Sequence, residues 1–155
     1  MIVDDVVKSA LKLLDTNKAC SDYIRGTSPN SPYTELAQLG ANHLLTYFNG
    51  VEGDPNEGPA VAATRGWWTG RGGSVAPVRV ALMYDFFQND VGGYTTWAGV
   101  GTTTARIEVI LHELRHVMIR QGHPSKRESD PESSYDYNKN IFKKCFGVDV
   151  PPPAN

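Results

Sequence analysis

Residues 110–124 read ILHELRHVMIRQGHP, and this stretch places His112 and His116 four positions apart, with Glu113 directly after the first histidine. We expect a helix from about 105 to 121. Residues four apart on a helix lie on the same face, so both imidazoles can point toward a single metal ion. Glu113 projects roughly 100° away from His112 around the helix axis. It would therefore lie near the metal without binding it, where a carboxylate can take a proton from a metal-activated water.

The helical expectation rests on the apolar pattern around the motif, which repeats at three- and four-residue steps. The positions that form this stripe are Ile107, Ile110, Leu111, Leu114 and Met118. The two histidines lie at the edge of the stripe, as a metal site in a cleft requires. The alternative interpretation is an ordinary amphipathic helix with two surface histidines beside its core.

The rest of the sequence predicts an α+β chain dominated by helices, with a small sheet. Amphipathic helices are expected at 2–15, at about 32–48 and at about 131–145. One strand is expected at 78–87, where apolar residues alternate with more mixed ones. The metal-binding helix thus follows the strand along the chain.

Length and composition fit one globular domain. The chain has 155 residues, of which 40% are hydrophobic and 21% charged. We expect a single domain over 1–150 and a proline-rich tail over 151–155. The net charge of −2 gives no footprint for nucleic acid or for an anionic membrane. No apolar run approaches the roughly 20 residues that span a bilayer, so neither a nucleic acid nor a membrane is expected as a partner.

The two cysteines, Cys20 and Cys145, lie near opposite ends of the chain. Such a pair suits a disulfide in an exported protein, but two buried free thiols fit equally well. The N-terminal sequence MIVDDVVKSALKLLD has two aspartates where a signal peptide needs basic residues. The chain is therefore expected to be either cytosolic or a mature part of a larger exported polypeptide.

The segment VILHELRHVM resembles the active-site helix of the zincin metallopeptidases. The resemblance implies a zincin-like metallopeptidase domain that hydrolyses peptide bonds in a peptide or protein substrate. It also implies Zn²⁺ as the cofactor, His112 and His116 as zinc ligands, and Glu113 as the general base that activates water.

A second resemblance covers more of the chain. The segments LLDTNKAC, HELRH and SDPESSYDYNKNIFKKCF are similar to uncharacterised secreted bacterial domains with the same helix and closing segment. The matching positions in the closing segment are Asp130, Ser134, Asn138, Ile141, Cys145 and Phe146. This resemblance implies a disulfide between Cys20 and Cys145 and a secreted or extracytoplasmic location.

The third zinc ligand is left open by the motif. The downstream candidates are His123, Glu128, Asp130, Glu132 and Asp136. His123 offers a nitrogen donor after a turn at Gly122, but it comes one residue too late for the metzincin subgroup of the family. We favour Asp130, which matches the acidic position of the resembling domains. An aspartate before Pro131 is also a good helix N-cap, which is the structural alternative for this residue.

Other functions and other residue roles stay open. The chain could be a non-catalytic, metal-stabilised module of a larger secreted protein, or an interaction domain with chance histidines. A site closed by four protein ligands would favour the structural role. The strand at 78–87 could pair with an extended substrate if it lies at a sheet edge. The candidate oxyanion donors are Tyr135, Tyr137, Arg115 and Arg120.

Overall fold

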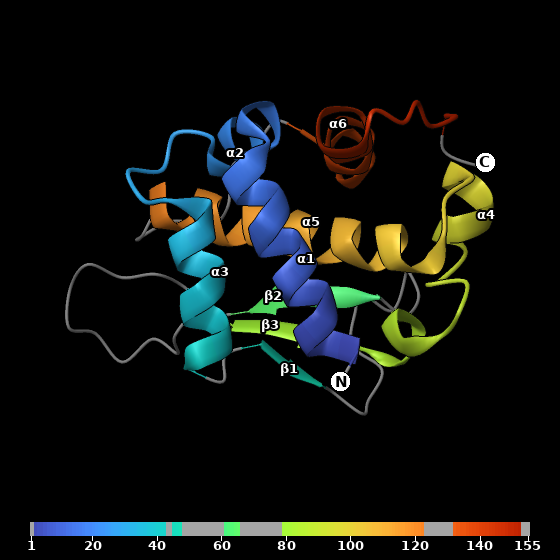
Figure 1. Cartoon of the computed structure of the whole chain (residues 1–155), viewed down its shortest axis with the longest axis horizontal. Helices are drawn as coiled ribbons and strands as arrows, with labels where there is room; N and C mark the ends of the chain where they lie inside the picture. The colour runs from blue at the N-terminus through green and yellow to red at the C-terminus, as the bar shows by residue number, and fades with distance from the viewer. Residues whose placement is uncertain (1, 43–44, 48–60, 66–78, 123–131, 153–155) are drawn as a thin grey trace.

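The computed structural model describes residues 2–42, 45–47, 61–65, 79–122 and 132–152. Within them, helices pack against a small sheet at one side of the molecule (Figure 1), which confirms the α+β class with helix dominant. The helices are α1 (Ile2–Thr16), α2 (Lys18–Arg25), α3 (Pro32–Ala41), α4 (Tyr94–Ala98), α5 (Thr102–Gly122) and α6 (Ser134–Phe146), with a 3₁₀ turn, η1 (Tyr84–Phe87). The strands are β1 (Leu45–Tyr47), β2 (Ala62–Arg65) and β3 (Arg79–Leu82).

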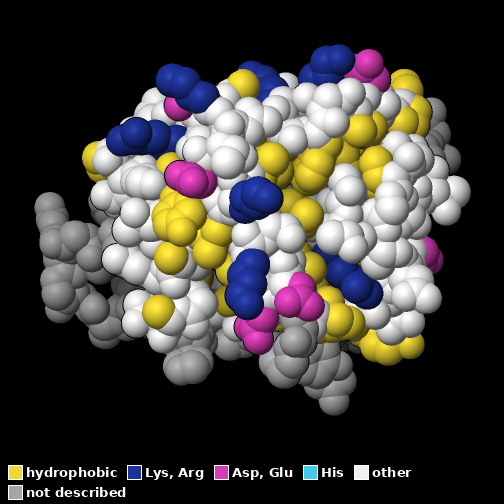
Figure 2. All heavy atoms as spheres, in the orientation of Figure 1, with side chains coloured by type: hydrophobic (Ala, Val, Ile, Leu, Met, Phe, Trp, Pro, Cys, Tyr) yellow, Lys and Arg dark blue, Asp and Glu magenta, His cyan; other side chains and the backbone are white. Residues whose placement is uncertain are grey.

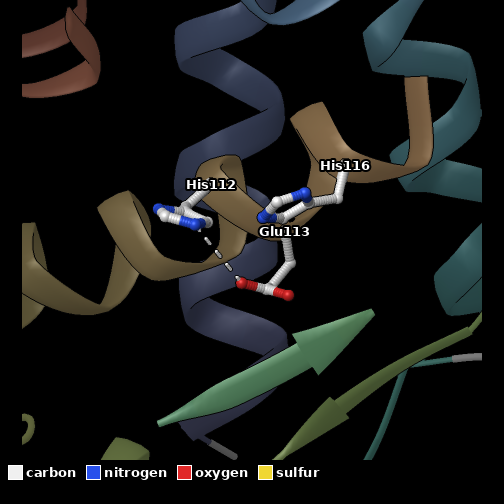
Figure 3. A group of neighbouring side chains, drawn as sticks. All are labelled: His112, Glu113 and His116. Carbon is white, nitrogen blue, oxygen red and sulfur yellow. Dashed lines mark ion pairs between the residues drawn. The ribbon is translucent and has the colours of Figure 1, made fainter. Parts of the chain in front are cut away.

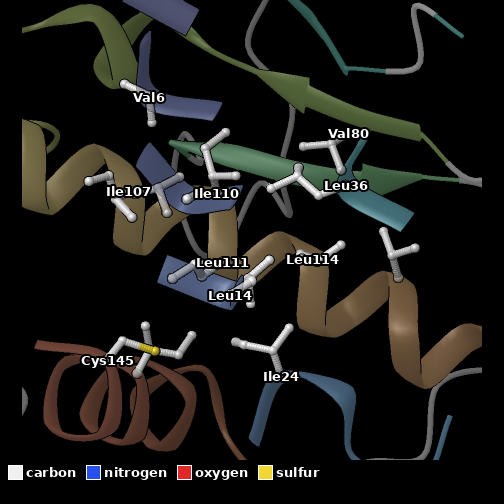
Figure 4. Packing of buried hydrophobic residues seen from close by; sticks show 14 of the residues in the cluster. Val6, Leu14, Ile24, Leu36, Val80, Ile107, Ile110, Leu111, Leu114 and Cys145 are labelled. Carbon is white, nitrogen blue, oxygen red and sulfur yellow. The ribbon is translucent and has the colours of Figure 1, made fainter. Parts of the chain in front are cut away.

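Helix α5 lies at the centre of the fold. Figure 1 shows α5 running across the molecule, with α1 crossing it, the sheet on one side and α6 on the other. The apolar stripe predicted for this helix is buried throughout, and it packs against α1 and α2 (Figure 4). Burial of several large aliphatic side chains, at about 1.5–3 kcal/mol each, fixes the position of α5.

The sheet has the order β1-β3-β2, with β1 parallel and β2 antiparallel to β3. The strand predicted at 78–87 is shorter than expected, because after Leu82 the chain turns into η1. The backbone N–H of Phe86 donates to the carbonyl of Met83, and both side chains are buried. A 3₁₀ turn brings residues three apart to the same side, so Met83 and Phe86 are buried together, while Tyr84, which the alternating pattern placed on the apolar side, is 63% exposed. The strand β3 is central in the described sheet, which makes the edge position considered for it wrong.

The helix predicted at about 32–48 ends earlier, at Ala41. Ser31 caps its start as a side-chain acceptor for the N–H of Thr34. At the other end, Asn42 donates its N–H to the Gln38 carbonyl and closes the helix. Asparagine has a low helix propensity, and the following Leu45–Tyr47 segment pairs with β3 instead.

The last helix begins later than predicted. Its N-cap is Ser133, which forms a capping box with Asp136 through Oγ and Oδ2. A capping box satisfies two backbone donors reciprocally, and the sequence Ser-Ser-Tyr-Asp provides it three residues after the predicted cap. Asp130 and Pro131 therefore do not begin the helix, and they lie outside the described residues.

A disulfide joins Cys20 on α2 to Cys145 on α6. It decides between the two interpretations of the cysteine pair, and its partners are 125 residues apart in the chain. Both side chains are buried beside the core of α5. Separately, none of the described helices is both long and apolar enough to cross a membrane.

Replacing Cys20 and Cys145 together by alanine should lower the free energy of unfolding by about 2–5 kcal/mol, since a cross-link of this span restricts the unfolded chain. Denaturant unfolding of the variant and of the wild type, with and without reductant, measures the loss. Reduced wild type should lose a comparable amount. Equal stability of the oxidised wild type and the double variant would contradict the assignment.

Candidate metal centre

The three side chains of the motif on α5 lie close together. One ligand atom from each of His112, Glu113 and His116 lies within 4.8 Å of the other two. His112 and Glu113 are buried, and His116 is half-buried. Figure 3 shows the two imidazoles on one side of the helix with the Glu113 carboxylate beside them. Figure 2 shows no described histidine on the face that it presents. The cluster could hold a metal ion.

Strand β2 orients the Glu113 carboxylate. The Thr64 hydroxyl lies 3.0 Å from Oε1 of Glu113 and 3.1 Å from the Glu113 backbone carbonyl, so both of its possible acceptors belong to the same residue. The other carboxylate oxygen, Oε2, lies 3.9 Å from Nε2 of His112. In Figure 3 the carboxylate points toward β2. One oxygen of Glu113 is thus held by the sheet while the other faces the histidines.

Helix α6 covers the histidines with an aromatic ring. Tyr137 is 1% exposed, and its ring centroid lies 5.0 Å from that of His112 and 4.7 Å from that of His116. Tyr137 is one of the candidate oxyanion donors, and it packs on both imidazoles. Tyr135 instead packs against Trp97, with their ring centroids 6.2 Å apart.

Arg115 is committed to packing the helices together. Its guanidinium binds the Glu132 carboxylate at 2.5 Å, donates to the backbone carbonyl of Tyr23, and lies 4.2 Å above the Tyr23 ring. It also lies 5.0 Å from the centroid of the Tyr137 ring. A guanidinium with these partners ties α5 to α2 and α6, so Arg115 has a structural role. The Arg120 side chain lies outside the described residues.

Two further polar residues lie beside Nδ1 of His112, and the sequence motif predicted neither of them. Glu108 lies one turn before His112, with 0% exposure and Oε1 3.8 Å from Nδ1 of His112. Asn138 on α6 places Oδ1 2.7 Å from the same Nδ1. The four-residue spacing of Glu108 and His112 could have indicated the first contact. The second contact depends on how α6 packs, which no local pattern reveals.

The electrostatics follow from burial and from these carboxylates. Burial raises the pKa of Glu108 because a charged carboxylate is desolvated in the core. Burial by itself would lower the pKa of His112. The neighbouring Glu108 and Glu113 outweigh it and raise that pKa to about 9. In the metal-free protein at neutral pH, the imidazole therefore holds a proton that a metal must displace.

The structure narrows the search for a third ligand. Of the downstream candidates, Glu132 binds Arg115, Tyr23 and Asn140, and Asp136 belongs to the capping box of α6. The remaining candidates, His123, Glu128 and Asp130, lie outside the described residues. The favoured residue, Asp130, thus stays a prediction.

Comparison with known proteins identifies no relative: the chain matches no protein-family model, no curated protein and no solved structure. We therefore infer the function from the site itself.

The chain should bind one divalent metal ion such as Zn²⁺, with an affinity that rises with pH up to about 9. The reason is that Nε2 of His112 must lose its proton first. Below that pH, linkage to one proton predicts roughly a tenfold loss of affinity per pH unit. Titration against a chromophoric chelator between pH 6 and 9 measures the slope.

The matched variants for this experiment are His112→Ala and His116→Ala, each of which should abolish binding. Asp149→Asn, which removes an exposed carboxylate paired with Lys143, should leave binding unchanged. Full metal occupancy in the double histidine variant would show that the ion binds elsewhere.

Proposed function

We propose that the chain is a zinc-dependent peptidase of the zincin type, in which His112 and His116 hold Zn²⁺ and Glu113 is the general base. The observation that carries the proposal is the arrangement of the three side chains on α5, within 4.8 Å of one another. Two histidines on adjacent turns supply the binding atoms, and the glutamate between them is oriented by a separate element.

The donor set suits zinc. Imidazole nitrogen is a common zinc ligand, and a catalytic zinc site combines three protein ligands with a fourth position for water or substrate. Tyr137 packs on both imidazoles, and His112 and Glu113 are buried; burial lowers the local dielectric and strengthens charge interactions. Asp130 is the proposed third ligand, on the resemblance to secreted bacterial domains.

In the proposed hydrolysis, Glu113 and Thr64 have separate roles. When bound, zinc supplies Lewis acidity that lowers the pKa of water and polarises a carbonyl. Glu113 accepts the proton of the attacking water on Oε2, the oxygen that faces His112. Thr64 keeps Oε1 occupied, so the carboxylate presents one fixed oxygen to the reaction. Glu113 can then pass the proton to the leaving amine.

The position of β2 supports a peptide as substrate. Among the described residues, β2 pairs only with β3, so its other edge has no strand partner. The N–H of Met83 donates to the Val61 carbonyl, and antiparallel pairs alternate between bonded and non-bonded positions. The backbone groups of Ala62 and Thr64 are therefore directed away from β3. An extended peptide could add to this edge, beside the residue that holds Glu113. We therefore propose that β2, and not the strand predicted at 78–87, pairs with an extended substrate.

A location outside the cytoplasm is part of the proposal. The Cys20–Cys145 disulfide supports it, because disulfides persist in oxidising compartments and are rare in the cytosol. The alternative function, a non-catalytic module stabilised by its metal within a larger secreted protein, shares this location. It differs in predicting no hydrolysis by the metal-loaded chain.

Glu113→Gln should keep zinc and lower peptide hydrolysis by about 10²–10⁴-fold, because an amide preserves the volume but cannot accept the proton. Zinc content and cleavage of a responsive peptide from a mixed library are measured together. The matched control is Glu35→Gln, which changes a buried glutamate on α3. Cleavage at the wild-type rate by Glu113→Gln would exclude it as the base. No cleavage by the wild type would favour the structural module.

Asp130→Asn should weaken zinc binding by more than the 10–100-fold that is typical of residues behind the ligands, since the amide oxygen carries no charge. His123→Ala should have a small effect. The two dissociation constants are compared at one pH above 9, so that protonation of His112 does not contribute. The reverse result, with intact binding in Asp130→Asn and loss in His123→Ala, would identify His123 as the ligand.

A further inference from the structure

Nδ1 of His112, the ring nitrogen that faces away from Glu113, lies near oxygen atoms of two other side chains. Oδ1 of Asn138 lies 2.7 Å from Nδ1, and Oε1 of Glu108 lies 3.8 Å from the same atom. These groups come from different helices, α6 and α5, so two independent parts of the fold present acceptors to one ring atom. Between two acceptors, Nδ1 is stabilised when it carries a hydrogen. Only the Asn138 contact is short enough to be a hydrogen bond.

The outer nitrogen of His112 faces the metal cluster. Nε2 lies 3.9 Å from Oε2 of Glu113, and it is the His112 atom directed toward that carboxylate (Figure 3). In a neutral imidazole, a hydrogen on Nδ1 leaves the lone pair on Nε2. A metal can bind only the nitrogen with the lone pair, so the position of that hydrogen decides whether His112 can serve as a ligand.

The Asn138 amide is held in the required orientation from its other end. Its Nδ2 donates to the Tyr94 hydroxyl at 3.3 Å. Burial raises the pKa of Tyr94, so the phenol stays neutral at physiological pH. Asn138 is itself 6% exposed, and turning the amide over would bring its NH₂ group against Nδ1–H of His112. Such a donor–donor contact in the core costs about 1–3 kcal/mol.

Glu108 adds a second observation that a purely structural role does not explain. Among the residues that the structure describes, neither of its carboxylate oxygens has a hydrogen-bond partner, and the side chain is fully buried. An unsatisfied buried carboxylate is costly, and Oε1 of Glu108 lies 3.8 Å from Nδ1 of His112, one turn away on the same helix.

We propose that Asn138 is the positioning residue for His112: it holds the hydrogen on Nδ1 and directs the Nε2 lone pair to the metal, with Glu108 as a supporting acceptor. The inference rests on the proposed metal site, and it adds a residue from α6 to a site that the motif places entirely on α5. Asn138 does not touch the metal or the substrate, so its effect passes through the tautomer and orientation of His112.

The experiment reads the tautomer and the metal affinity separately. Long-range ¹H–¹⁵N NMR of the metal-free wild type at pH 10, where the ring carries one hydrogen, should show His112 protonated at Nδ1. Asn138→Leu removes the acceptor at similar volume and should shift His112 toward the Nε2–H tautomer. It should also weaken Zn²⁺ binding by about 10–100-fold. Asn138→Asp keeps an oxygen at the same place and should retain Nδ1–H and near wild-type affinity.

The matched control is Asn140→Leu, on the same helix. Asn140 binds Glu132 and the Asp136 carbonyl rather than His112, so this variant should leave the tautomer and the zinc affinity unchanged. It reports any general effect of losing a hydrogen-bonded asparagine from α6.

Two results would overturn the proposal: an Nε2–H tautomer in the wild type, or a folded Asn138→Leu variant with wild-type tautomer and affinity. The first needs only the wild type, so misfolding of a variant cannot obscure the test. If the wild type shows Nδ1–H but binds no Zn²⁺, the tautomer assignment stands and the zinc peptidase proposal fails. If Zn²⁺ binds through His112 with equal affinity in the wild type and in Asn138→Leu, the metal site stands and the positioning role of Asn138 fails.

Discussion

The burial of α5 is the constraint on which the rest of this structure depends. The helix carries an apolar stripe, but Glu108, His112, Glu113 and Arg115 are also buried. Polar side chains in a core are stable only with partners, and an unpartnered charge is far more costly than an unpartnered amide or hydroxyl. The neighbouring elements provide most of these partners: Thr64 from β2, Asn138 and Tyr137 from α6, and the Tyr23 carbonyl from α2. The contacts that pack α5 into the fold are therefore the same contacts that position the residues of the site.

This arrangement separates structural from chemical roles along a single helix. Arg115 points toward α2 and the start of α6, where Glu132 and the Tyr23 ring neutralise and cover it. A different side of α5 carries His112, Glu113 and His116, and it faces β2 and Tyr137. The disulfide joins α2 to α6, so the two helices that carry the partners of α5 are cross-linked to each other. A site that needs His112 and Asn138 within hydrogen-bond distance benefits from that restraint.

Local sequence patterns predicted the parts of the molecule that local interactions determine. The three- and four-residue repeat located α5 and its buried stripe, and the spacing of His112, Glu113 and His116 predicted their shared face. The ends of elements were less predictable, because more than one nearby residue type can cap a helix: Asp130 was the predicted cap, whereas Ser133 forms the capping box. Thr64 and Asn138 could not be predicted, since they meet the motif from 49 and 26 residues away. The short helices α2 and α4 were also missed, because helices of 8 and 5 residues show little periodicity. The cysteine count left a disulfide and two free thiols equally open. Only the resemblance to secreted bacterial domains favoured the disulfide.

The central claim is that α5 provides two imidazole ligands to one zinc ion, and X-ray absorption at the zinc edge tests it directly. The chain is loaded with one equivalent of Zn²⁺, and its first coordination shell is measured in solution. The account predicts four light scatterers at about 2.0–2.2 Å, with the outer-shell pattern of two imidazole rings and no sulfur, because both cysteines are in the disulfide. A shell of oxygen atoms alone, without imidazole scattering, would contradict it.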